Sequence, residues 1–126
     1  MPYALAFLVL PLVLHPGTQC TMESRTRHFL VWINSNQHIK VGLPQRARAL
    51  VPYSREALTF LCQTGVIAIS AQDASLSILR GLRRRQQGAQ PSDDTRACLG
   101  KSVVLGKWFA RTNSPATIYA SLGLMP

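Results

Sequence analysis

The sequence predicts a mainly α-helical domain with one small β-hairpin, which is an α+β fold. Apolar residues recur at helical spacing before residue 65 and again after residue 92. Between these regions, two β-rich runs at residues 66–70 and 76–79 flank a loop of turn-forming length. The chain has 126 residues, of which 47% are hydrophobic, so we expect one compact domain with its own core.

The first predicted helix covers residues 4–14, which are almost all apolar, so we expect it to be buried on most faces and to end at Pro16 and Gly17. A secretion signal is a competing interpretation, but no Lys or Arg precedes the run and no small-residue cleavage pattern follows it. The apolar run over residues 3–14 has twelve residues, which is also too few for a membrane span, since a span needs about 20. We therefore expect a cytoplasmic protein without membrane contact, which also fits three cysteines in neither a disulfide nor a zinc pattern.

Three further pieces are predicted before the middle of the chain. Apolar residues at helical spacing indicate a second helix that begins at Ser24, its N-cap, and runs to about Asn34. Residues 38–41 are predicted to form a short extended piece. Pro44 then suits the first turn of a third helix over residues 45–51.

Pro52 is predicted to break this third helix, because proline lacks the backbone donor that a helix interior needs. Ser54 restarts it as an N-cap, and Gly65 ends it. The hairpin follows directly. Helices followed by a hairpin give the order of elements in a winged-helix domain, in which the helix before the wing often faces the partner.

A basic stretch at residues 83–91 has the composition of a solvated linker. It divides a helical, winged-helix-like portion, residues 1–82, from a C-terminal helical unit, residues 92–126. Within that unit, Ser92 followed by two aspartates predicts a strong helix start.

The C-terminal helix is predicted to carry two adjacent faces. One is apolar and includes Trp108 and Phe109, and the other is basic and includes Arg96, Lys107 and Arg111. An apolar centre beside a basic flank is typical of a protein interface, so we predict that these five residues dock a partner. The alternative is that Trp108 closes the core of this protein.

The charge balance favours an acidic partner, either nucleic acid or an acidic protein face. Fourteen Lys and Arg residues oppose five Asp and Glu residues, which gives a net charge of +9. The densest cluster follows the hairpin and consists of Arg80, Arg83, Arg84 and Arg85. These side chains either contact a phosphate backbone or lie in water as part of a linker, and both interpretations stay open.

The sequence gives no indication of catalysis. The five acidic residues are scattered, and the three histidines share neither a helix face nor a metal-binding spacing. Common nucleotide-binding, hydrolase and metalloprotease motifs are absent from the sequence. We therefore expect a protein that is not an enzyme and that binds neither a metal nor a cofactor.

Three stretches of the chain resemble one known family. They are YALAFLVLPLVLH at residues 3–15, VGLPQRARALVPYSREALTFLCQTGVIAI at residues 41–69, and LGKWFARTNSPATIYASLGLMP at residues 105–126. These stretches are similar to the middle component of bacterial three-component ABC-ATPase conflict systems, to which Lamassu-type anti-phage and anti-plasmid defence belongs. The resemblance implies a helical, non-catalytic adaptor that joins an SMC-like ABC ATPase to an effector, often a nuclease, with DNA contacted through the complex.

One departure from the family concerns the start of the chain. Another helical segment usually precedes the LAFLVLPLVLH run in this family, whereas this chain begins almost on it, so Met1 can be an internal methionine of a longer reading frame. Two other functions remain as alternatives. One is a free-standing winged-helix DNA-binding transcriptional regulator, and the other is a small secreted or membrane-associated protein.

Overall fold

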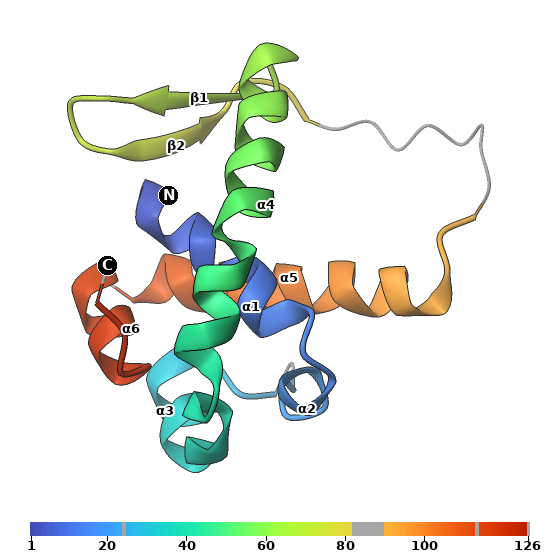
Figure 1. Cartoon of the computed structure of the whole chain (residues 1–126), viewed down its shortest axis with the longest axis vertical. Helices are drawn as coiled ribbons and strands as arrows, with labels where there is room; N and C mark the ends of the chain where they lie inside the picture. Colours follow the sequence, from blue (N-terminus) through green and yellow to red (C-terminus); the bar gives the residue numbers. More distant parts are fainter. Residues whose placement is uncertain (24, 82–89, 113, 126) are drawn as a thin grey trace.

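The structure is a computed structural model that describes residues 1–23, 25–81, 90–112 and 114–125 (Figure 1). It confirms the α+β prediction, with helices on both sides of a single two-stranded hairpin in the chain order. The elements are the 3₁₀ helix η1 (Tyr3–Leu5), α1 (Ala6–Val13), α2 (Pro16–Gln19), α3 (Phe29–Ser35), the 3₁₀ helix η2 (Gln37–Lys40), α4 (Leu43–Gln63), β1 (Ile67–Ser70), β2 (Ser75–Ile78), α5 (Asp93–Arg111) and α6 (Pro115–Ser121).

Helix α1 lies at the centre of the molecule, as its apolar sequence predicts. It packs against both α4 and α5, which cross in Figure 1. Its residues Leu8, Leu12 and Val13 are buried, and Pro11 within the helix is buried with them. The helix ends at Val13, but Pro16 and Gly17 do not simply stop it. They begin the short helix α2, whose first turn is capped by the His15 side chain, since Thr18 N donates to His15 Nδ1 at 3.2 Å.

The prediction that Pro52 divides two helices is wrong. Helix α4 is continuous over 21 residues and holds Pro52 in its interior. A proline in a helix removes one backbone hydrogen bond, and here the packing of α4 against α1 stabilises the helix despite that loss. Pro44 does lie in the first turn, and Gly65 ends the helix in the left-handed region with φ +68°. There the Val66 amide donates to the Leu61 carbonyl at 2.9 Å, which closes the helix end.

Two other local predictions also need correction. Residues 37–40 form the 3₁₀ helix η2 and not an extended piece. Helix α3 begins at Phe29, five residues after the predicted start at Ser24, and Ser24 itself lies outside the described residues. Before Phe29, backbone carbonyl groups accept hydrogen bonds from side chains of α3 and α5 in place of a helical pattern.

The predicted hairpin is confirmed. Strands β1 and β2 are antiparallel, with Ile67 opposite Ile78 and Ile69 opposite Leu76. The N-terminal residues run along the free edge of β2, where Tyr3 N donates to Ala74 O at 2.7 Å and an isolated bridge pairs Pro2 with Ser75. The hairpin is therefore tied to the start of the chain as well as to the end of α4 (Figure 1).

Four aromatic rings from α3 and α5 form a cluster at the centre of the hydrophobic core. The ring centroids of Trp32 and Trp108 are 5.1 Å apart, and Phe29 lies 5.5 Å from Trp32 and 5.6 Å from Phe109. Tilted and edge-to-face rings at such distances add about 0.5–1.5 kcal/mol per pair beyond the burial of their apolar surface. This cluster joins the C-terminal helix to the N-terminal half of the chain.

The irregular segment before α3 is held by side chains of α5 and α3. Trp108 Nε1 donates to Thr26 O at 2.7 Å, and Trp32 Nε1 donates to Thr21 O at 3.1 Å. Lys101, which helical spacing places inside the apolar face of α5, donates through Nζ to the Met22 carbonyl. These donors satisfy backbone acceptors that no helix or strand would otherwise pair.

Replacing Trp108 tests this arrangement. We expect Trp108→Ala to lower the free energy of unfolding by about 3–5 kcal/mol, because it removes the ring and opens a cavity. Trp108→Phe keeps an aromatic ring but leaves the Thr26 carbonyl unpaired, so we expect a loss of about 1–3 kcal/mol. Urea denaturation of both variants measures these values. An unfolding midpoint of Trp108→Ala equal to that of the wild type would contradict the packing described here.

Candidate docking surfaces

The structure separates the five residues that the sequence predicts as a docking site. Trp108 is only 1% exposed and Phe109 only 4%, so both rings lie in the core of this chain. This placement supports the alternative that Trp108 closes the core. All three basic residues of the prediction are exposed. Arg96 and Lys107 lie on the side of α5 away from the core, whereas Arg111 lies at the edge of the core side.

The outward side of α5 carries apolar residues that were not among the predicted docking residues. Leu99 is 50% exposed and Val103 is 58% exposed, and both lie on the same side of the helix as Arg96 and Lys107. We call this surface the outer α5 face and define it by Arg96, Leu99, Gly100, Val103, Gly106 and Lys107. The sequence could have indicated this surface. Leu99 and Val103 lie three and seven positions after Arg96, which is the spacing of residues on one side of a helix. It was missed because the aromatic stripe is the stronger signal.

The three basic residues of the predicted docking site differ in what they already contact. Arg96 is 3.4 Å from the Asp93 carboxylate and donates to Pro91 O at 3.2 Å. Arg111 donates to Arg27 O at 3.0 Å and so helps to hold the segment before α3. Lys107 makes no ion pair or hydrogen bond with any described residue. Lys107 is therefore the basic residue of the outer α5 face that is free to meet a partner.

The predicted phosphate-contacting cluster is described only at its first residue. Arg80 Nη2 donates to Thr64 O at 2.8 Å, at the C-terminal end of α4. This contact places a positive charge where the helix dipole is negative, so Arg80 has a structural role. Arg83, Arg84 and Arg85 lie outside the described residues, and their contact with phosphate stays a prediction.

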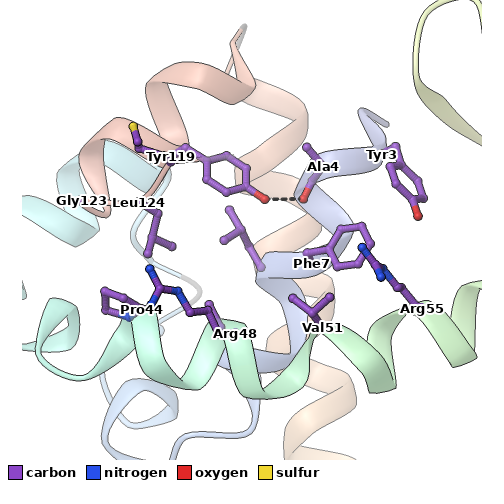
Figure 2. A pocket seen from close by; sticks show the side chains of 13 residues that line it. Tyr3, Ala4, Phe7, Pro44, Arg48, Val51, Arg55, Tyr119, Gly123 and Leu124 are labelled. Atoms are coloured by element: carbon purple, nitrogen blue, oxygen red, sulfur yellow. Dashed lines mark hydrogen bonds between the residues drawn. The ribbon is translucent and has the colours of Figure 1, made fainter.

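A groove of about 670 Å³ opens between α4, the N-terminal segment and the C-terminal end of the chain (Figure 2). One wall is a single side of α4. The opposite wall comes from η1, α1 and the residues at the end of α6. The lining residues are Tyr3, Ala4, Phe7, Leu8, Pro44, Ala47, Arg48, Val51, Arg55, Tyr119, Gly123, Leu124 and Met125. Nothing in the sequence pattern predicted this groove.

Internal contacts fix the wall opposite α4. The Tyr119 hydroxyl donates to Ala4 O at 2.7 Å, as Figure 2 shows, and burial raises the pKa of Tyr119, so the hydroxyl stays protonated as a donor. The rings of Tyr3 and Phe7 meet edge to face, with centroids 5.2 Å apart. Gly123, at φ +71°, reverses the chain after α6. Contacts within this chain thus hold the wall opposite α4 in place.

Among the described residues, the charged side chains that line the groove are Arg48 and Arg55. Both are exposed, and neither has an ion-pair or hydrogen-bond partner within the described part of the chain. Arg46, on another side of the same helix, donates to Val41 O at 3.2 Å and to Ile39 O at 3.3 Å. Arg46 therefore holds the start of α4, whereas Arg48 and Arg55 leave their donors available.

A second apolar surface lies on the hairpin. Ile67, Ile69, Leu76 and Ile78 share one face of the two strands, and Ile78 is 79% exposed. A two-stranded sheet by itself is marginally stable, so its apolar face gains from being covered.

Neither a metal site nor a membrane span is found in the described residues. Among them, no three His, Cys, Asp or Glu side chains come together as a set that could bind a metal ion. None of the helices in these ranges combines the length with the continuous hydrophobicity that crossing a bilayer requires.

Comparison with known proteins identifies the family. A family model described as ABC-three component (ABC-3C) system Middle Component 3 matches residues 1–126. No curated protein and no solved structure matches the chain. The family match agrees with the resemblance carried by the three stretches at residues 3–15, 41–69 and 105–126. Because it covers the whole chain, this protein belongs to the Middle Component 3 family of ABC-three component systems.

Proposed function

We propose that this middle component is a non-catalytic adaptor that joins an SMC-like ABC ATPase to an effector subunit, often a nuclease. The complex acts in the bacterial cytoplasm in anti-phage or anti-plasmid defence of the Lamassu type. Membership of a three-component family favours this function over a free-standing winged-helix regulator. Three free cysteines are compatible with a reducing compartment.

The outer α5 face is the observation that supports this proposal most directly. It combines two exposed apolar side chains, Leu99 and Val103, with the free cation of Lys107. An apolar centre with a charged border is the usual composition of a protein interface. The outer side is the one available for docking, because the core side of the same helix is already occupied by Phe29 and Trp32. We propose the ATPase as the partner that docks there.

Two glycines within α5 add to the argument. Gly100 and Gly106 are exposed in a helix interior, where glycine is less stable than alanine by about 1 kcal/mol. Apart from the neighbouring residues and backbone of α5 itself, a Cβ atom at either position would meet no atom of the described residues within 4 Å, so packing among these residues does not require a glycine there. Small residues allow another backbone to approach a helix closely, which fits a partner helix on the outer α5 face.

Replacing both glycines should change stability and docking in opposite directions. We expect Gly100→Gln with Gly106→Gln to raise the free energy of unfolding by about 1 kcal/mol, because Gln is the better helix former. The same variant should co-purify less ATPase, because its side chains occupy the outer α5 face. Ala57→Gln, on the exposed side of α4, is the control. Full co-purification by the double variant would count against docking at this face.

Reversing the charge of Lys107 tests the same face by electrostatics. We expect Lys107→Glu to change stability by no more than about 0.5 kcal/mol, since the side chain is exposed. It should weaken co-purification with the ATPase and abolish defence in a phage-infection assay. Arg25→Glu makes the same change of charge at another exposed position. Arg111 stays unchanged, because its reversal would also break the hydrogen bond to Arg27. If Lys107→Glu retains the ATPase as the wild type does, the assignment is wrong.

The proposed DNA contact is tested with the assembled complex. We expect Arg83→Ser, Arg84→Ser and Arg85→Ser together to weaken DNA binding and to reduce its salt dependence, by about 0.9 in the logarithmic slope for each phosphate that is no longer neutralised. Sequence preference should not change, since phosphate contacts carry little sequence information. Arg80 is kept, because it contacts the end of α4. An unchanged slope in binding titrations would show that the three residues act only as a linker.

A further inference from the structure

We propose that the groove along α4 receives an amphipathic helix from a partner subunit, with an apolar stripe in the groove and acidic side chains on Arg48 and Arg55. This inference rests on the adaptor function proposed above. It assigns a second interface, separate from the outer α5 face, and it states what chemistry the bound segment must have.

The dimensions of the groove suit a short helix. Its α4 wall extends from Pro44 to Arg55, and eleven helical steps span about 16 Å, or three turns. The lining on both sides is mainly apolar, with Phe7, Val51 and Leu124 among its side chains (Figure 2). A helix laid in such a groove buries residues three, four and seven positions apart, which is a common mode of recognition between proteins.

The two arginines specify the charge of the occupant. Arg48 and Arg55 are seven residues apart, so they project from the same side of α4 about 10 Å apart along its axis. A neighbouring helix meets both with carboxylates that are also about seven residues apart. Since both guanidinium groups lack partners among the described residues and lie beside apolar surface, each can form a bidentate pair with a carboxylate.

A second copy of this chain does not fit these requirements. Its net charge is +9, and its five acidic residues are Glu23, Glu56, Asp73, Asp93 and Asp94. No two of them are seven residues apart, and the aspartates at positions 93 and 94 occupy the first turn of α5. Nucleic acid fits poorly as well, because the groove offers two cations in a mainly apolar lining. The chemistry therefore points to an acidic helix of another subunit.

Charge reversal in the groove is the first test. The double variant Arg48→Glu with Arg55→Glu is co-expressed with the other components, and the affinity of each subunit for the purified variant is measured. We expect one partner to bind at least about tenfold more weakly, while Lys107→Glu affects the ATPase through the other face. The pair Arg25→Glu with Arg27→Glu, two exposed residues away from the groove, carries the same change of charge as a control.

A second variant keeps the test decisive if charge reversal disturbs folding. Ala47→Phe fills the groove without changing any charge, and we expect the same partner to be lost at an unchanged melting temperature. Unaltered binding of all subunits by a folded Ala47→Phe variant would overturn the inference. The adaptor function would stand in that case, because it depends on co-purification of the wild type and on the outer α5 face.

Crosslinking identifies the occupant. A photoreactive benzoylphenylalanine placed at position 125, where Met125 is exposed at the rim of the groove, should crosslink in the assembled complex to a partner segment with a helical apolar repeat and acidic residues about seven positions apart. Changing those acids to Arg should restore binding to Arg48→Glu with Arg55→Glu. Crosslinks that fall on a second copy of this chain, on nucleic acid or on a segment without acidic residues would overturn the inference.

Discussion

The fold depends on how the carbonyl groups between residues 21 and 27 are satisfied. This stretch has no regular hydrogen-bond ladder among its described residues, yet it packs beside the aromatic core, where an unpaired backbone acceptor costs about 1–3 kcal/mol. Donors from two helices solve the problem. The indole N–H groups of Trp32 and Trp108 and the cations of Lys101 and Arg111 each donate to one of these carbonyls. The same side chains that build the core thus also fix its irregular edge.

This arrangement has a consequence for α5. Its inner side supplies an apolar ring cluster and three polar donors, so that side of the helix is fully used within the chain. What remains for a partner is the outer side, where Leu99, Val103 and Lys107 are exposed. The division of one helix into a structural side and a free side follows from the spacing of its residues. It explains why an interface cannot be assigned from the most aromatic stripe of a helix alone.

The sequence predicted those elements whose signals are local. The N-cap at Ser92, the helix stop at Gly65 and the hairpin of two β-rich runs all depend on residues close to one another in the sequence, and all three are confirmed. The continuity of α4 through Pro52 could not be predicted in this way, because it depends on packing against α1. The groove was equally inaccessible, since its walls come from residues near 3, 48 and 124, which only the tertiary fold brings together.

The N-terminal residues connect surfaces that are otherwise separate. Tyr3 donates its amide to the hairpin turn at Ala74, while the neighbouring carbonyl of Ala4 accepts the hydroxyl of Tyr119 from α6. Both residues also line the groove. A displacement of this segment by even one ångström therefore has to stretch a hydrogen bond to the hairpin, to α6 or to both. If a partner in the groove shifts this segment, it also changes the hydrogen bonds to the hairpin, and by thermodynamic reciprocity a partner on the hairpin then changes the affinity at the groove.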